Sequence, residues 1–281
     1  MQAIERSKAA EKLGKKVGLA FSRVVRPGTA KDLLSGTWMG HPAHPMLTDL
    51  PIGAWMSSLA LDLAGGVPAR TAADTLVGLG VLSAVPTAIT GVNDLADVVN
   101  KEERAVGLVH AIGNVASLAL YAASYAARKR HLRTEGVALS MLGAASLAAS
   151  GFLGGHLSYR RGIGVAQTAF QPRIAEWTAV LDDDRLPQES PRRVSASGVD
   201  VLLYRSGDRI CALANRCSHR GGPLHKGRVT RTDVRCPWHH SIFRLEDGLV
   251  LQGPTTAPQP RYDVRVVERR IEIRSPPPTT L

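Results

Sequence analysis

Four long apolar stretches occupy most of the first 160 residues of the chain. They run over about 45–66, 75–92, 105–127 and 136–155, and the last three contain no formally charged side chain. A bilayer core about 30 Å thick needs about twenty apolar residues as a helix, so this pattern predicts a four-helix transmembrane bundle. A soluble four-helix bundle is the alternative, but it would need a charged outer face, which the third and fourth stretches lack.

From Glu176 onward the apolar positions recur at every second residue instead. Short strand-like runs at 201–204, 209–212, 249–251, 264–266 and 271–273 are separated by Gly, Asp and Pro turns. Many short strands without helices predict a small antiparallel β domain. The expected fold class is therefore α plus a separate all-β domain, with the transmembrane bundle N-terminal and the β domain C-terminal.

These changes of pattern give the expected domain boundaries. Residues 1–34 form a basic N-terminal arm, 35–161 the four-helix membrane domain, 162–175 a linker, 176–275 the β domain and 276–281 a proline-containing tail. In the arm, Leu13, Val17 and Phe21 recur at helical spacing among many Lys and Arg residues. Such a basic amphipathic helix either lies on an anionic membrane surface or packs on its own protein, and the pattern leaves both open.

The composition narrows the partners and the compartment. The 281 residues carry a formal net charge of +11, and the pI is about 10.1. An excess of basic residues suits nucleic acid, an anionic membrane or an acidic redox partner. Given the apolar stretches, we expect the membrane as a partner and no nucleic acid; the choice of a redox partner protein depends on the metal-ligand pattern of the β half. With three cysteines no disulfide framework is expected, which agrees with a reducing compartment.

Two Cys-plus-His pairs stand in the β half. Cys217 is followed two residues later by His219, and Cys236 is followed three residues later by His239. Thiolates are soft ligands that suit iron–sulfur clusters and zinc, and imidazole suits iron and zinc. A [2Fe–2S] centre with two Cys on one iron and two His on the other needs one Cys and one His from each of two loops. A zinc site is the alternative, although its usual ligand spacings differ.

This stretch resembles the Rieske iron–sulfur family. The resemblance includes the sixteen-residue gap between the two pairs, the Gly221–Leu224 run, and a proline-rich segment over 253–262 that looks like the loop covering the cluster in that family. It implies a [2Fe–2S] cluster held by Cys217, His219, Cys236 and His239. It further implies that Ser241 donates a hydrogen bond to a cluster sulfur, while Phe243 stands where high-potential members have a tyrosine. In quinol-oxidising members two further cysteines form a disulfide. Gly222 and Trp238 occupy those positions here, so we expect a disulfide-free, ferredoxin-like domain.

The membrane half carries a second group of candidate residues. The run Gly40–Pro45 resembles the His-Pro-x-His-Pro signature of a poorly characterised bacterial family of four-helix membrane domains, which implies architecture more firmly than activity. In an up-down bundle, four histidines would lie at one membrane face: His41, His44, His110 and His156. Paired imidazoles at one level could bind a metal ion or haem b. We therefore expect a second metal or haem site there.

The expected function is electron transfer rather than stand-alone catalysis. A membrane-anchored carrier with one [2Fe–2S] cluster fits both halves of the chain. The alternatives are an anchored ferredoxin component of an oxygenase system and a non-enzymatic redox sensor. The excess of Lys and Arg on the side of the termini predicts a multi-pass protein of the cell membrane with its β domain in the cytoplasm.

Overall fold

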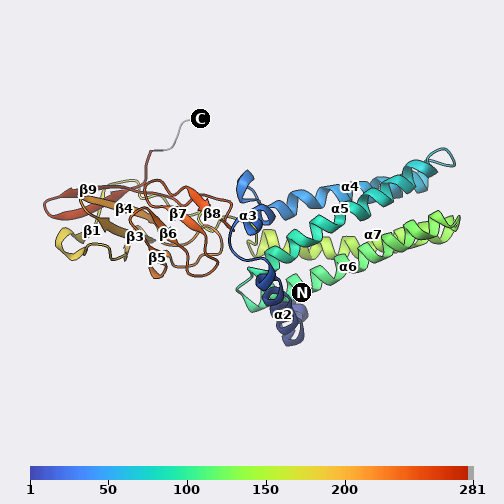
Figure 1. Ribbon diagram of the computed structural model, residues 1–281, viewed down its shortest axis with the longest axis horizontal. Coiled ribbons are helices and arrows are strands. Elements are labelled where there is room, and N and C mark those ends of the chain that lie inside the picture. The colour runs from blue at the N-terminus through green and yellow to red at the C-terminus, as the bar shows by residue number, and fades with distance from the viewer. Residues whose placement is uncertain (278–281) are drawn as a thin grey trace. The chain divides into compact units, whose positions relative to one another are not determined.

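The computed structural model describes residues 1–277, and the chain separates into two compact units (Figure 1). The first unit contains Met1–Arg26 and Pro42–Ile163. The second contains Pro27–His41 together with the described residues from Gly164 onward. The expected combination of an α-helical N-terminal region and a separate antiparallel β domain is confirmed. The placement of Pro27–His41 in the β unit was not expected from the sequence.

Six α-helices build the first unit: α1 (Gln2–Glu5), α2 (Lys8–Val24), α4 (Ala43–Ala64), α5 (Arg70–Ala96), α6 (Lys101–Lys129) and α7 (Arg133–Gly155), which continues as a π-helical turn over His156–Arg160. The four long helices run in two antiparallel pairs, α4 with α5 and α6 with α7 (Figure 1). The ends of α6 follow local rules. Asn100 caps its first turn by accepting a hydrogen bond from Glu102 N, and Arg128 and Lys129 lie at its negative C-terminal end.

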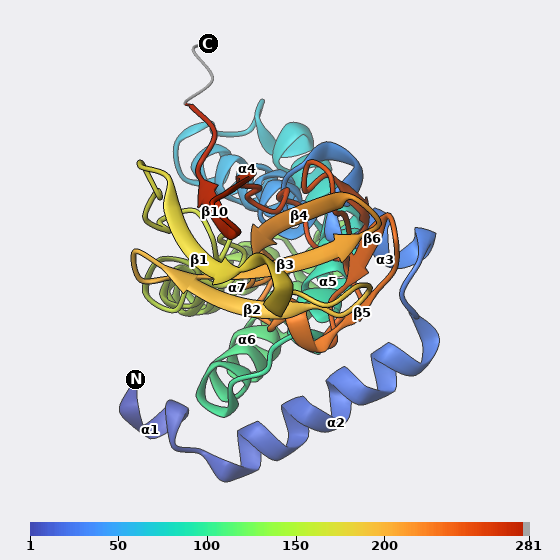
Figure 2. The same ribbon diagram turned by 90° about the vertical axis from the view of Figure 1, so that its left-hand side faces the viewer.

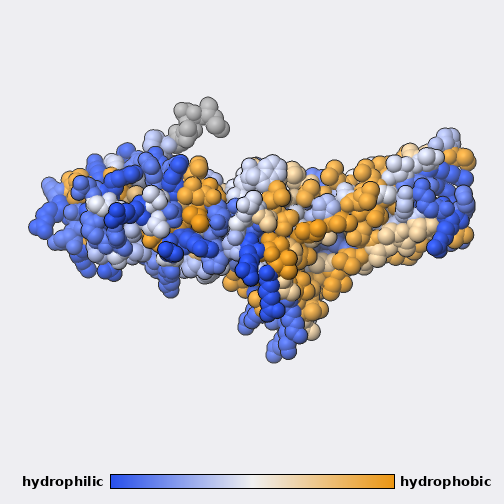
Figure 3. Space-filling view, in the orientation of Figure 1, coloured by the Kyte–Doolittle hydropathy of each residue, from blue (hydrophilic) through white to orange (hydrophobic). Residues whose placement is uncertain are grey.

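Three helices are long and apolar enough to cross a membrane: Arg70–Ala96, Lys101–Lys129 and the continuous helix Arg133–Arg160. The fourth span expected from the sequence, α4, is not among them, since it carries polar residues such as Asp49 and Asp62 along its length. Large apolar side chains point outward from the long helices, among them Leu82, Ile112, Val115, Leu142 and Phe152. In Figure 3 hydrophobic residues cover the shafts of these helices, and hydrophilic residues gather at the end where α6 meets α7. An outward apolar face with a polar end is typical of helices in lipid.

Close contacts inside the bundle depend on small residues. Trp55 of α4 stacks on Tyr121 of α6 with ring centroids 4.1 Å apart. A Cβ atom on Gly80 of α5 would lie 2.2 Å from the indole nitrogen of Trp55, so only glycine fits at this position. This agrees with the small residues expected at helix contacts in membranes.

A buried ion cluster joins all four long helices near one end of the bundle. The fully buried guanidinium of Arg128 in α6 donates to Asp62 of α4 and to Asp74 of α5. Arg133 of α7 donates to the same two carboxylates at 2.5 Å and 2.8 Å. Two arginines and two aspartates balance in charge, which is how buried charges persist in an apolar environment.

The N-terminal helix α2 packs on its own protein through glycines. Figure 2 shows α2 lying across the bundle beside α6. The missing side chains of Gly14 and Gly18 let α2 approach Arg104 of α6 and Ala96 of α5. Leu13 remains 49% exposed, so part of the apolar face of α2 stays available to a membrane surface.

The β unit contains three antiparallel sheets with the orders β1-β10-β9, β2-β3-β4 and β5-β6-β7-β8. Their strands are β1 (Thr178–Asp182), β2 (Arg192–Ala196), β3 (Val199–Ser206), β4 (Arg209–Ala214), β5 (Arg228–Val229), β6 (Asp233–Arg235), β7 (Ile242–Arg244), β8 (Val250–Gln252), β9 (Asp263–Val267) and β10 (Arg270–Arg274). Strand β3 is buried on both faces, with Leu203 in one apolar core and Leu202 in the other. The segment from the N-terminal half adds α3 (Thr29–Ser35) and a 3₁₀ turn over Thr37–Met39.

Candidate metal centre

Two loops of the β unit repeat the same backbone geometry. In the first, which follows β4, Cys217 N donates to Gly222 O and Gly221 N donates back to Cys217 O. In the second, between β6 and β7, Cys236 N donates to Ser241 O and His240 N donates to Cys236 O. The fifth residue of each loop, Gly221 or His240, has a left-handed φ of 76° or 66°. Each loop therefore presents its cysteine and histidine from a tight, internally bonded turn.

The two cysteines approach each other beneath these turns. Cys217 is 1% exposed and Cys236 is 2% exposed, and their thiols are hydrogen-bonded. Backbone N–H groups of His219 and Arg220 point to the sulfur of Cys217, and those of Trp238 and His239 to the sulfur of Cys236. The hydrogen bond between the thiols lowers the pKa of Cys236 to about 7. Amide donors aimed at two sulfurs are the environment that stabilises metal-bound thiolates.

The two histidines form a second pair. The rings of His219 and His239 lie 5.0 Å apart between centroids, at an angle of 89°. Metal–imidazole bonds are about 2 Å long, so two imidazoles on one tetrahedral metal have centroids roughly 5 Å apart. Burial lowers the pKa of His219 well below its usual value, which keeps the imidazole neutral and able to act as a ligand.

The donor atoms occur in pairs rather than in a ring around one point. Within residues 1–277 no group of three or more His, Cys, Asp or Glu side chains is placed to hold a single metal ion. A structural zinc ion needs four such ligands together. A [2Fe–2S] cluster needs only two protein ligands per iron, because its bridging sulfides complete the coordination. The two buried thiols and the two facing imidazoles therefore fit a [2Fe–2S] cluster.

The positions expected to lack a disulfide lie side by side. A Cβ atom on Gly222 would lie 3.1 Å from the Trp238 ring and 2.9 Å from the Cys236 sulfur. Glycine at position 222 thus leaves room for the second loop to approach closely. All three cysteines of the chain are free.

Buried polar residues connect the cluster loops to the proline-rich segment. Gln259 is 2% exposed; its amide donates to Ala214 O and Arg216 O and accepts from Ser218 N. The fully buried Ser241 accepts a hydrogen bond from Thr255 N at 3.2 Å. The sequence did not point to Gln259, because a lone glutamine carries no motif.

The segment that joins α2 to α4 also contacts the proline-rich loop. Asp32 accepts a hydrogen bond from Gly253 N at 3.0 Å, and Thr37 donates to Thr255 O at 3.1 Å. A Cβ atom on Gly253 would lie 2.1 Å from the Thr37 hydroxyl. Lys31 is only 5% exposed, and its positive charge contributes to the lowered pKa of His219. A piece of the N-terminal half is therefore part of the cluster environment, which no local sequence signal indicated.

The four membrane histidines are not gathered into one group. His44 and His110 face each other with ring centroids 6.4 Å apart. His156 bonds instead to Glu5 at 3.1 Å. His41 belongs to the β unit, whereas the other three belong to the helical unit. Of the three expected histidines in the helical unit, the structure brings His44 and His110 together and pairs His156 with a carboxylate.

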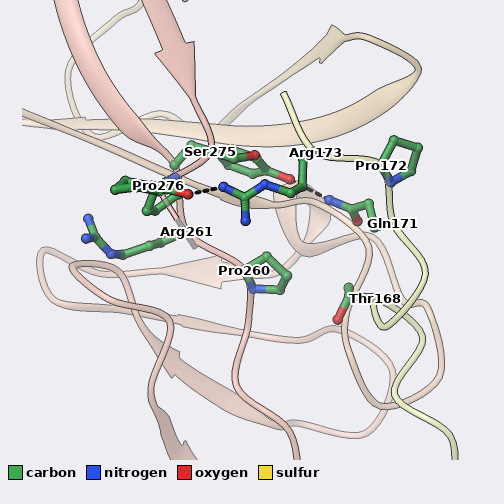
Figure 4. A pocket seen from close by; sticks show the side chains of 10 residues that line it. Thr168, Gln171, Pro172, Arg173, Pro260, Arg261, Ser275 and Pro276 are labelled. Carbon is green, nitrogen blue, oxygen red and sulfur yellow. Dashed lines mark hydrogen bonds between the residues drawn. The ribbon is translucent and has the colours of Figure 1, made fainter. Parts of the chain in front are cut away.

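A separate surface pocket lies in the β unit (Figure 4). It is lined by Thr168, Gln171, Pro172, Arg173, Pro260, Arg261, Tyr262, Ser275, Pro276 and Pro277. In Figure 4 the side chain of Arg173 reaches across it toward the backbone oxygen of Pro276. None of the four expected cluster ligands lines this pocket.

Comparison with known families agrees with the division of the chain. Residues 176–266 match the family described as "Rieske [2Fe-2S] domain", and residues 40–167 match the family described as "Predicted membrane protein (DUF2231)". The Rieske resemblance expected from the sequence is confirmed, as is a predicted membrane domain fused to it. The match to the second family does not test the His-Pro-x-His-Pro signature.

Individual relatives resemble the C-terminal part of the chain. The ferredoxin subunit of anthranilate 1,2-dioxygenase from Burkholderia cepacia is 28% identical over 100 residues, which is 36% of this chain and 93% of that protein. Ferredoxin CarAc from Metapseudomonas resinovorans is 28% identical over 98 residues, 34% of this chain and 92% of that protein. Apoptosis-inducing factor 3 from Mus musculus is 32% identical over 84 residues, 30% of this chain but only 14% of that protein. Among solved structures, the ferredoxin of carbazole 1,9a-dioxygenase from Nocardioides aromaticivorans IC177 is 27% identical, covers 36% of this chain and 100% of its own, and has a TM-score of 0.35.

Proposed function

Because this chain joins a Rieske [2Fe–2S] domain to a predicted membrane domain, we propose that it is a membrane-anchored one-electron carrier. The observation that carries the proposal is the paired arrangement of two buried thiols and two facing imidazoles on two matching loops. Cys217 and Cys236 would hold one iron of the cluster, and His219 and His239 would hold the other. The cluster supplies the one-electron chemistry when bound.

The chain's own residues set the surroundings of the cluster. The amides aimed at Cys217 and Cys236 stabilise negative charge on the sulfurs. Gln259 and the Ser218 backbone hold the first loop against the proline-rich segment. Trp238 is 44% exposed beside His239, so this edge of the domain is the one we propose for contact with a redox partner.

The proposed partner is an oxygenase-type acceptor. Two of the relatives are ferredoxins of dioxygenase systems, and the alignments span more than nine-tenths of each. The disulfide-free Gly222–Trp238 contact fits that ferredoxin-like class. The helical unit anchors the carrier in the cell membrane, with the β unit in the cytoplasm. A second metal or haem site in that unit is part of the same proposal.

The test is spectroscopy of the full-length protein, purified anaerobically in mild detergent. We expect about two irons per chain and, after dithionite reduction, the rhombic electron paramagnetic resonance signal of mixed Cys/His ligation. Cys217→Ser and Cys236→Ser should each abolish the signal. Cys211→Ser is the matched control, because Cys211 is a free, half-buried thiol on β4.

Two results would contradict the ligand assignment. One is a folded wild-type protein that binds zinc but no iron. The other is a Cys217→Ser variant that keeps the rhombic signal. Reduced protein that fails to pass electrons to any ferredoxin-dependent oxygenase component, while its cluster is intact, would contradict the proposed partner class but not the cluster.

A further inference from the structure

The His44 ring lies inside the helical unit, and the neighbouring helix α5 fixes its orientation. His44 Nδ1 lies 3.0 Å from the backbone oxygen of Thr87. A carbonyl oxygen can only accept, so Nδ1 carries the proton and Nε2 keeps its lone pair. One helical turn further along α5, Gly91 faces the ring edge, and a Cβ atom there would lie 2.8 Å from His44 Cε1.

The His110 ring is held in the same way by the other helix pair. His110 Nδ1 lies 2.8 Å from the backbone oxygen of Ser150 in α7. Four residues later Gly154 faces the ring, and a Cβ atom there would lie 2.9 Å from His110 Cε1. The Asn114 amide lies 3.0 Å from His110 Nε2, so this nitrogen is again the acceptor. The two antiparallel helix pairs therefore hold their histidines in the same way. In each pair a backbone carbonyl binds Nδ1, and a glycine four residues later leaves room for the ring between the helices.

The separation of the two rings matches ligation on opposite sides of one metal atom. With metal–imidazole bonds of about 2 Å and the ring centre about 1.1 Å behind the nitrogen, two trans imidazoles have centroids roughly 6 Å apart. The observed separation of His44 and His110 is 6.4 Å, against 5.0 Å for the cluster pair His219 and His239. Ligation leaves the angle between the two ring planes free, so the observed 85° fits it.

The number of ligands decides between a bare metal ion and a larger cofactor. A metal ion without its own ligands needs at least three protein donors, and residues 1–277 provide no such group. A haem needs two, because the porphyrin supplies four nitrogens. All three cysteines of the chain lie in the β half, so the helical unit has no thiol for covalent haem attachment. We infer that His44 and His110 are the axial ligands of one non-covalently bound b-type haem.

Two axial histidines define what such a haem does. With both axial positions filled by protein, the iron is six-coordinate and suits electron transfer rather than oxygen binding. When the haem is bound, the Asn114 amide must leave His110 Nε2; it retains its second bond, to His110 O at 3.0 Å. The backbone oxygens of Thr87 and Ser150 continue to orient the two rings, as outer partners of metal-ligating histidines do.

The inference is tested on the full-length chain expressed with added δ-aminolevulinate, and again after adding hemin to the purified protein in detergent. We expect about one haem per chain by pyridine haemochrome and a low-spin, bis-imidazole signal in the oxidised state. His44→Ala and His110→Ala should each reduce the haem content at least tenfold. His156→Ala is the matched control and should leave it unchanged, because His156 is bonded to Glu5.

Folding and cluster content are checked on the same samples. Helicity by circular dichroism and a single gel-filtration peak exclude collapse of the helical unit in His44→Ala and His110→Ala. The reduced cluster signal should be unchanged, so failure of the haem site is distinguishable from failure of the Rieske assignment. A wild-type chain that carries its cluster but takes up no haem by either route overturns the inference. So does a His44→Ala or His110→Ala variant that retains the low-spin spectrum.

Discussion

Two buried serines lie in the cluster loops, and their hydroxyl groups make different hydrogen bonds. The hydroxyl of Ser218 lies 2.8 Å from Ala257 O, a group that can only accept, so its proton points away from the cluster. The hydroxyl of Ser241 accepts from Thr255 N, which leaves its proton to donate elsewhere. We expect that proton to reach a cluster sulfur. Ser241→Ala should therefore lower the reduction potential, and Ser218→Ala should not.

The magnitude follows from the energy of a hydrogen bond to a charged group. Such a bond contributes about 1.5–3 kcal/mol, and roughly half of it differs between the oxidised and the reduced cluster. For a one-electron couple about 1.4 kcal/mol corresponds to about 59 mV. Ser241→Ala should thus shift the midpoint downward by about 50 mV. Ser218→Ala should leave the midpoint within about 10 mV while lowering stability by about 1–2 kcal/mol, because partners buried with it lose a hydrogen bond.

The assay is a dye-mediated potentiometric titration at fixed pH, followed by the reduced-state magnetic resonance signal. Both variants must first show wild-type iron content. An unchanged midpoint for Ser241→Ala would remove Ser241 from this role. Equal shifts in the two variants would mean that the loss of packing, and not a specific donor, sets the potential.

Two further substitutions test contacts between distant parts of the sequence. Gly253→Ala should displace the Thr37 turn from the proline-rich loop, because its Cβ would lie 2.1 Å from the Thr37 hydroxyl. We expect the free energy of unfolding to fall by about 1–3 kcal/mol. The measurement is denaturant unfolding, followed by the absorbance of the cluster. Arg128→Met should leave Asp62 buried with only Arg133 as its partner, costing about 3–5 kcal/mol. Its measurement is thermal unfolding of the helical unit in detergent, and an unchanged transition would show that the ion cluster is not a structural element.

The cluster loops could be predicted from the sequence because each one is local. Cys217 and His219 lie on one turn, Cys236 and His239 on another, and the backbone bonds that shape each turn span at most five residues. The separation of helical and β halves was equally predictable, since the hydrophobic period changes from helical to alternating. No property of the rest of the chain was needed for either prediction.

The contacts that were missed join residues far apart in the sequence. The bond between Asp32 and Gly253 spans 221 positions, and that between His156 and Glu5 spans 151. The local sequence around a histidine on an apolar helix does not show whether its side chain contacts another imidazole, as His110 does, or a carboxylate, as His156 does. The partner of His156 is Glu5 of α1, which lies 151 positions away in the sequence.

The ion cluster bears on whether α4 spans the membrane. Asp62, one of the residues that lower the apolar character of α4, has no exposed side-chain surface and pairs with Arg128 and Arg133. A neutralised aspartate is far less costly in lipid than an isolated one. The antiparallel pairing of α4 with α5, and its 22-residue length, then suit a fourth span.

With α4 as a fourth span, the turn between α4 and α5 and the turn between α6 and α7 would lie on one side of the membrane, and both termini on the other. The N-terminal arm with Lys101, Arg104, Arg160 and Arg161 outnumbers the basic residues of those two turns. Arg128, moreover, is buried in the bundle rather than in a loop. The termini should therefore be cytoplasmic. Reporter fusions that fluoresce only in the cytoplasm should be bright at the C-terminus and dark within residues 65–69 or 130–132. A bright fusion at 65–69 would show that α4 does not cross, and a dark C-terminus would reverse the orientation.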